Sequence, residues 1–268
     1  MEIAQAKIDE WRKQPNYQKK LLSFNIPSLG SMPDIPEECE ELLFYNCGII
    51  KFNKPFPPRL RVLVIRSCRN LIYVPTEFPE SLEQLIIESC RFAEYIDKQN
   101  GHYHMYPSDD NRLTALPKHL TYLVLNQTGI VELPKHLPLT LTYMNLLETY
   151  LNDIPELPEG LQTLYVNDNE VLPYLPDSLE RLYYNDFEQG FEDMDMEEDE
   201  IQEIHAERIQ SANQAYEWPR SLKRSQERCS IVKEDLMAAA WNPNRVQKWL
   251  EAGDEVFDNI TGADNYTF

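Results

Sequence analysis

A motif built on proline and leucine recurs through the middle of the chain and constrains the fold more than any other feature. It reads Pro-x-x-Leu-x-x-Leu-x-Leu-x-x-(Cys/Asn/Thr), and its seven copies start at Pro36, Pro57, Pro79, Pro117, Pro138, Pro158 and Pro176. Successive starts lie 21, 22, 38, 21, 20 and 18 residues apart, so one step is too long by about one repeat. Repeats of this length predict a solenoid, in which each copy forms one turn and packs against its neighbours.

The apolar positions within each copy alternate as a β-strand requires. Counted from the proline, the sixth and eighth residues are apolar and the seventh lies on the opposite side of the same strand. The chain has 19 prolines against 8 glycines, and most copies carry a second proline three or four residues before the first, as in Pro155 and Pro158. This spacing favours an extended, polyproline-II path on the outer side of each turn.

The copy at Ile154–Asn169 reads Ile-Pro-Glu-Leu-Pro-Glu-Gly-Leu-Gln-Thr-Leu-Tyr-Val-Asn-Asp-Asn. This pattern, PxLPxxLxxLxLxxN, resembles the short leucine-rich repeats of bacterial effector proteins, and the resemblance covers about Ile35–Glu188. It implies an α/β leucine-rich-repeat solenoid, with parallel short strands on the concave side and polyproline-II or extended segments on the convex side.

The segments on either side of the repeats predict helical ends, because their apolar residues follow a helical spacing. We expect a helical N-terminal cap followed by the repeats, and an acidic linker followed by a helical C-terminal unit. The predicted boundaries are 1–30 for the cap, 31–188 for the repeats with an insertion near 94–112, 189–203 for the linker and 204–268 for the C-terminal unit.

Within the C-terminal unit, Leu236–Gly253 contains the sequence Ala-Trp-Asn-Pro-Asn-Arg-Val-Gln-Lys-Trp-Leu. It resembles a C-terminal element in proteins of giant, mimivirus-like DNA viruses, where such a motif follows repeat domains. The resemblance implies a viral origin and tells little about activity. The same aromatic and aliphatic residues also suit the core of a helical hairpin.

Composition excludes several classes of partner and location. A net charge of −20 disfavours binding to nucleic acid, and no window approaches eighteen consecutive apolar residues, so we expect no membrane insertion. The 5 cysteines show no metal-binding spacing, and Met1–Trp11 is not an apolar export signal, so we expect a protein that is not secreted and lies in the host cytoplasm or the virion. Cys47, Cys68 and Cys90 occupy the inward eleventh position, which predicts a structural role.

The sequence shows no arrangement typical of an enzyme, and we predict no catalytic, cofactor or metal site. Bacterial effectors with this repeat type can carry a ubiquitin-ligase domain with a Cys-x-Asp nucleophile motif, but Cys229, the only cysteine of the tail, lacks the aspartate. His102 and His104 could share one face of a strand and bind zinc, yet no third ligand of suitable spacing lies nearby.

The fifth, seventh and ninth positions of each copy point outward from the sheet and are unusually apolar. Solvated strand faces are normally polar, so this stripe predicts that something covers it. The cover is either a partner protein, for which tyrosines are natural anchors, or the insertion or helical tail folded back. The predicted protein-binding residues are Leu43, Val64, Ile86, Tyr122, Val124, Tyr143, Tyr165 and Tyr183.

These observations predict a non-enzymatic protein–protein interaction module of viral origin that binds a viral or host protein through its concave surface. As an adaptor, it would bind a host protein in the infected cytoplasm. The alternative is a structural role, as a minor capsid or other virion-associated component of a giant virus particle. A weaker alternative is an effector of the ubiquitin pathway.

Overall fold

The computed structural model describes residues 2–15, 20–90, 93–99, 102–107, 111–167, 171–184 and 199–214, with backbone only for 93–99 and 102–107. The chain divides into two compact units, Met1–Asn213 and Gln214–Phe268, and nearly all described residues belong to the first. Cys229, the segment Leu236–Gly253 and most of the acidic linker lie outside the described residues.

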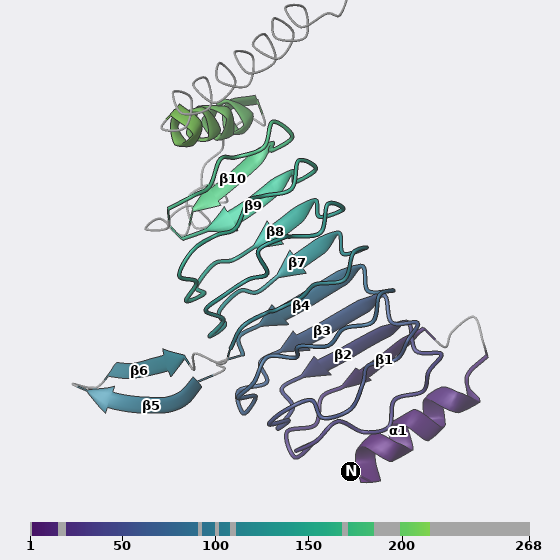
Figure 1. Ribbon diagram of the computed structural model, residues 1–268. Coiled ribbons are helices and arrows are strands. Elements are labelled where there is room, and N and C mark those ends of the chain that lie inside the picture. The colour runs from purple at the N-terminus through teal and green to yellow at the C-terminus, as the bar shows by residue number, and fades with distance from the viewer. Residues whose placement is uncertain are drawn as a thin grey trace, which may run out of the picture. The chain divides into compact units, whose positions relative to one another are not determined.

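Eight short strands form one parallel sheet in the order β1-β2-β3-β4-β7-β8-β9-β10 (Figure 1). Each strand pairs in phase with the next, so that Leu42 is opposite Leu63 and Leu63 is opposite Leu85. The strands are β1 (Leu21–Phe24), β2 (Glu41–Tyr45), β3 (Val62–Arg66), β4 (Gln84–Glu88), β7 (Tyr122–Val124), β8 (Tyr143–Asn145), β9 (Thr163–Val166) and β10 (Arg181–Tyr184). This topology confirms the predicted solenoid of parallel strands.

The core is a stack of equivalent side chains from successive turns. Every sixth-position residue is 0% exposed: Leu42, Leu63, Leu85, Leu123, Met144, Leu164 and Leu182. Near the N-terminal end the rings of Phe24 and Phe44 stack at 5.4 Å, and Phe44 also contacts Phe52 at 5.4 Å. Each turn therefore buries its apolar side mainly against its two neighbours, as the repeat requires.

The anchor proline serves the same purpose in all seven copies. Its carbonyl accepts a hydrogen bond of 3.0–3.2 Å from the N–H of the residue three positions later, as between Pro57 and Leu60. This closes a β-turn that leads into the strand, and the proline contributes only its carbonyl, so its missing N–H costs nothing there. After the strand, the tenth residue is left-handed in five copies, with φ between 48° and 54°, at Asn46, Ser67, Ser89, Gln127 and Glu148.

The N-terminal cap contains the expected helix and a strand that the pattern did not indicate. The helix α1 (Glu2–Lys13) buries Ala4, Ile8 and Trp11. The strand β1 extends the sheet by pairing with β2 in parallel, and its Leu22 and Phe24 occupy the sixth and eighth positions of an additional turn. The repeat motif did not reveal this turn, because Pro15 lies one residue before the position where the motif places its first proline.

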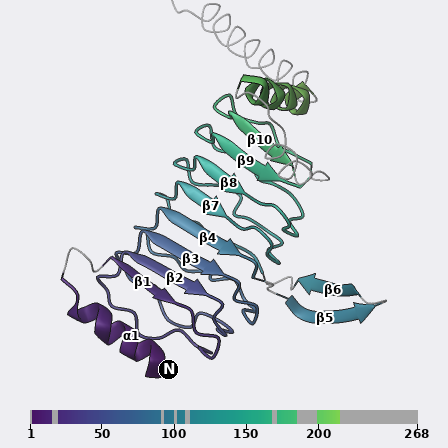
Figure 2. The ribbon, with the colours of Figure 1, turned by 180° about the vertical axis from the view of Figure 1, so that it is seen from behind.

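The long step between the third and fourth copies corresponds to an inserted hairpin. Strands β5 (Ala93–Gln99) and β6 (His102–Pro107) pair in an antiparallel fashion and form their own two-stranded sheet (Figures 1 and 2). Because β4 pairs directly with β7, the parallel sheet continues across the insertion. Surplus residues are therefore accommodated outside the repeat and leave its register unchanged.

A second helix, residues 199–214, closes the C-terminal end of the sheet and supplies the expected C-terminal helix. Its Ile209 and Ala212 pack against the core. The side-chain amide of Asn213 donates to the Leu175 carbonyl at 3.0 Å and accepts from the Leu175 N–H at 2.8 Å, which fixes the helix to the last turn. No helix in the described part of the chain is long and apolar enough to cross a membrane.

Candidate protein-binding face

The concave face comprises the residues at the fifth, seventh and ninth positions of each turn. In β3, Val62 and Val64 of this face are half-buried, whereas Leu63 and Ile65 between them are completely buried. The strand period of two therefore separates core from surface as predicted. The face differs chemically between its N-terminal and C-terminal halves.

The N-terminal half, on β1 to β4, is aliphatic at the seventh position of β2 to β4, and this column is flanked by charged residues of the fifth and ninth positions, such as Glu41, Arg66 and Glu88. Leu43, Val64 and Ile86 of the predicted set are all half-buried there. The additional strand β1 contributes Leu21, which is 46% exposed and pairs with Glu41 at the fifth position. Sequence reasoning missed Leu21 because it did not recognise the turn that contains it.

The C-terminal half carries four tyrosines in contact, Tyr122, Tyr143, Tyr165 and Tyr183, which we call the tyrosine ladder. Tyr122 stacks on Tyr143 at 4.2 Å and Tyr165 on Tyr183 at 4.3 Å, with interplanar angles of 11° and 9°. In-register parallel strands lie about 4.8 Å apart, which suits stacking of equivalent rings. Tyr143 and Tyr165 meet at 5.6 Å and 43°, where the ladder changes from the fifth to the seventh position.

The surroundings of Tyr143 within the ladder disfavour ionisation of its hydroxyl group. Burial raises the pKa of Tyr143 above its usual range, and the neighbouring Tyr165 and Tyr122 raise it further by charge repulsion and hydrogen bonding. The phenol of Tyr143 is therefore neutral at physiological pH and offers both a hydrogen-bond donor and an acceptor.

Three outward residues in the middle of the face are buried, namely Val124, Asn145 and Leu147, which is 2% exposed. Val124, one of the predicted binding residues, is only 7% exposed, as is Asn145 beside it. The Asn145 side-chain oxygen accepts a hydrogen bond of 3.0 Å from the Leu147 N–H. Val124 thus lies beneath the face rather than on the surface that a partner would meet.

The last ring of the ladder contacts the chain's own C-terminal helix. His205, which is 1% exposed, meets the ring of Tyr183 edge-on at 4.7 Å, and its Nδ1 lies 3.0 Å from the Leu182 carbonyl. Arg208 donates to the same carbonyl at 3.3 Å. Of the two covers expected from the sequence, the helical tail is therefore present at Tyr183.

We expect the contribution of His205 to stability to fall as the pH falls. Burial lowers the pKa of His205 below its usual range, and Arg208 and Arg181 lower it further. The unfolded chain then binds a proton more readily than the folded chain, so folding is weakened as the pH drops below about 6.5, the ordinary value. Thermal unfolding at about pH 7.5 and 5.5 should show a smaller pH effect in His205→Gln than in the parent. The exposed His136 provides the control; the same pH effect in His205→Gln and His136→Gln would contradict this assignment.

The cysteines that follow the strands are structural, as predicted. The thiols of Cys47, Cys68 and Cys90 are buried and donate to carbonyls of the preceding turn, at Phe24, Phe44 and Ile65. The neighbouring Cys68 and burial both raise the pKa of Cys47. In the next two copies Thr128 and Thr149 take this position and bond to carbonyls at 2.7 Å.

We expect the buried thiols to be inert towards a thiol reagent in the folded protein, because the thiolate is the reactive species. Burial raises the pKa of Cys39, the fourth buried cysteine, to about 12. In a Cys229→Ser background, Ellman's reagent should label these cysteines only after denaturant is added. Rapid labelling of the native protein would show that the turns open.

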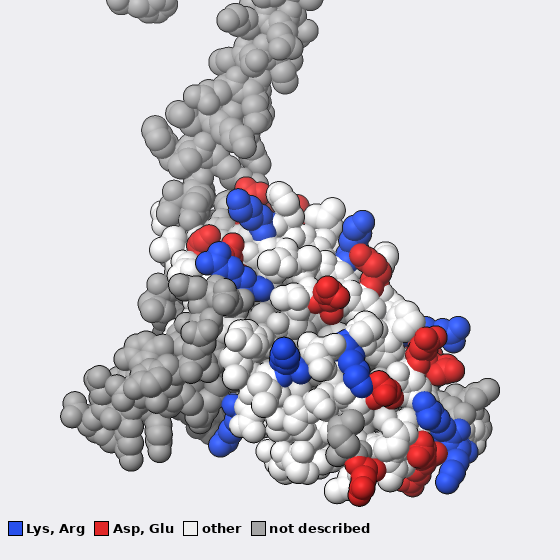
Figure 3. Space-filling view, turned by 60° about the horizontal axis from the view of Figure 1, so that its bottom comes forward, with Lys and Arg blue, Asp and Glu red and all other residues white. Residues whose placement is uncertain are grey.

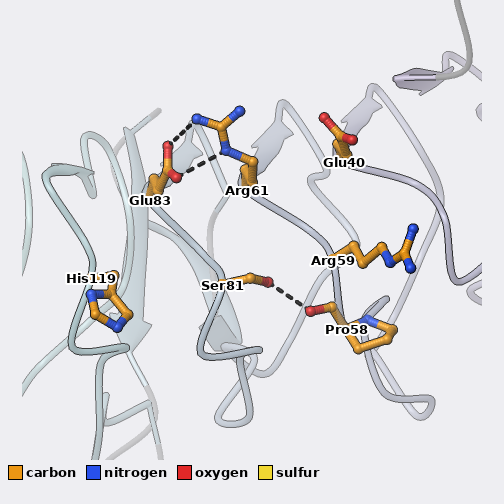
Figure 4. Close-up of a pocket in the computed structure, with 7 residues that line it drawn as sticks. All are labelled: Glu40, Pro58, Arg59, Arg61, Ser81, Glu83 and His119. Atoms are coloured by element: carbon orange, nitrogen blue, oxygen red, sulfur yellow. Dashed lines mark hydrogen bonds and ion pairs between the residues drawn. The ribbon is translucent and has the colours of Figure 1, made fainter. Parts of the chain in front are cut away.

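A hollow of about 450 Å³ lies on the turns that lead into β3, β4 and β7, outside the predicted stripe (Figure 4). Arg61 donates to both carboxylate oxygens of Glu83, at 2.9 and 2.7 Å, and this ion pair lowers the pKa of Glu83. The hollow is lined by Glu40, Pro58, Arg59, Arg61, Ser81, Glu83 and His119. Both signs of charge are present there, and Figure 3 shows them interspersed over the surface. We assign no ligand to this hollow.

The in-phase parallel sheet and the repeated motif define the chain as a leucine-rich-repeat protein. No family model and no curated protein matches it. Among solved structures it is similar to YopM from Yersinia enterocolitica WA-314, with 27% sequence identity over 58% of this chain and a TM-score of 0.37. The match spans 39% of the YopM chain, which is well under half of its length.

Proposed function

We propose that this leucine-rich-repeat protein is a non-enzymatic interaction module whose concave face binds a protein partner. The observation that carries the proposal is the chemistry of that face, which has an aliphatic column of Leu43, Val64 and Ile86 on β2 to β4 and is tyrosine-rich on β7 to β10. A strand face that only meets water is normally polar, whereas tyrosines are enriched among the anchors of protein interfaces. A rigid sheet presents these anchors at low cost in conformational entropy.

We propose further that the chain comes from a giant, mimivirus-like DNA virus and acts in the host cytoplasm or in the virus particle. The support is the resemblance of Leu236–Gly253 to the C-terminal element of such viral proteins. An adaptor would bind a host protein, whereas a structural component would be held by other virion proteins along the same face. Proteomics of purified particles distinguishes them: stoichiometric presence supports the structural role and absence supports the adaptor.

Site-specific photo-crosslinking tests whether the concave face is the docking site. Gln84 is exposed on this face and pairs with Tyr122, so a photo-reactive residue placed there would lie beside the ladder. Tyr150, which is exposed on the turn beyond β8, gives a matched position outside the face. We expect a defined crosslinked partner from position 84 and none from position 150. Crosslinks to one partner from position 150 alone would refute the proposal.

A further inference from the structure

The tyrosine half of the concave face has no charged side chain at its outward positions on β7, β8 and β9. Three of the nine residues at these positions, Val124, Asn145 and Leu147, are buried. The six that reach the surface carry no charge, although charged residues make up 26% of the chain: Tyr122, Asn126, Tyr143, Thr163, Tyr165 and Asn167.

The charges nearest to this surface on the N-terminal side already have partners. Arg66 on β3 forms an ion pair of 2.7 Å with Glu88 on β4, at the ninth position of the same face. A charged residue laid on the ladder by a partner would therefore lose hydration without gaining a counter-ion. That cost is several kcal/mol for a fully buried ion, so an uncharged contact is favoured around Tyr122 and Tyr143. The charge on the other side of the ladder is Arg181 on β10, which pairs with β9 in the sheet and lies two strands away from Tyr143.

The stacking of the rings also restricts what the ladder can bind. Tyr122 and Tyr143 occupy one face of each other's ring, and Tyr165 and Tyr183 do the same. The outer faces of Tyr143 and Tyr183 are used as well, by Tyr165 and His205. Nucleic acid bases bind to such surfaces by stacking on free ring faces, which this arrangement largely removes. What the ladder presents are ring edges and neutral hydroxyl groups.

Ring edges and neutral hydroxyls fit an uncharged polypeptide. Amides, hydroxyls and backbone groups can exchange hydrogen bonds with the phenols, and apolar side chains can pack on the ring edges and on the aliphatic column beside them. Resting on the proposed function, we propose that the partner segment bound by the tyrosine ladder is an uncharged stretch of polypeptide with amide, hydroxyl and apolar side chains.

Selection of random twelve-residue peptides displayed on phage, with the full chain as bait, tests this inference. We expect enrichment of peptides without charged residues, whose capture is lost in the Tyr122→Ala/Tyr143→Ala variant and kept in Tyr150→Ala. Synthetic copies of these peptides should bind with a Kd that changes less than about twofold between about 50 and 500 mM NaCl, because little of the binding is Coulombic.

The outcomes separate this inference from the proposed function. Charged peptides that need the ladder and weaken steeply with salt would overturn the inference but leave the concave face as the docking site. Peptides that bind the double variant and the parent equally would contradict both. If the parent protein selects no peptides beyond those that the double variant selects, the inference that the ladder binds a linear, uncharged segment is overturned.

Discussion

Replacing Phe44 with alanine is expected to lower the free energy of unfolding by about 3–5 kcal/mol, the usual cost of removing a fully buried phenylalanine. Phe44 is 0% exposed, and its ring contacts Phe24 of the preceding turn and Phe52 of the following segment, each at 5.4 Å. Truncation would leave a cavity shared by adjacent turns, in a fold whose stability depends on contacts between neighbours. Urea unfolding of the parent and the variant measures the difference.

The matched control is the next residue in the same strand. Tyr45 is 49% exposed at the ninth position, so Tyr45→Ala should change the free energy of unfolding by no more than about 0.5 kcal/mol. The contrast between adjacent residues tests the strand alternation itself. Equal losses in the two variants would mean that β2 does not face the core as described.

Replacing Tyr122 or Tyr143 with alanine is expected to weaken partner binding by roughly 2 kcal/mol or more each, as for aromatic anchors at the centre of an interface. Because the two rings stack at 4.2 Å, the losses should not be additive in the double variant. Titration calorimetry with the crosslinked partner, once purified, measures the affinities, and thermal unfolding shows whether the fold is retained. Tyr73→Ala, which changes a tyrosine 43% exposed outside the concave face, should leave the affinity unchanged.

A different pattern would indicate that the chain itself covers the ladder. Loss of a ring that packs against the chain's own residues lowers stability, because the cost is then intramolecular. His205 already provides such a contact for Tyr183, so Tyr183→Ala should lower the melting temperature through loss of that edge-on contact. A large fall in melting temperature for Tyr122→Ala, with no change in affinity, would contradict the assignment of this ring to a partner.

The sequence predicted the repeat and its core because one simple period encodes both. Leu63 and Leu123 are recognisable by their distance from Pro57 and Pro117, and the structure buries both completely. The turn containing β1 escaped notice because its proline is displaced by one residue. The hairpin of β5 and β6 belongs to no repeat, so only the size of the insertion was predictable.

The concave face was predictable as columns of residues but not as a set of contacts. The periodicity places Tyr143 and Tyr165 in different columns, and only the three-dimensional arrangement shows that their rings meet at 5.6 Å. Likewise, Val124 belongs to an outward column, yet its neighbours bury it. The contact between His205 and Tyr183 joins residues on a strand and a helix that share no sequence pattern, so the repeat could not reveal it.

Hydroxyl-radical footprinting of the tyrosines, with and without the partner, tests the docking of a protein on the concave face most directly. Tyr122 and Tyr143 report on the face, and the exposed Tyr73 and Tyr150 report on the rest of the same molecule. We expect the partner to slow oxidation of Tyr122 and Tyr143 and to leave Tyr73 and Tyr150 unchanged. Protection of Tyr73 and Tyr150 alone, with the ladder oxidised as fast as in the free protein, would contradict it.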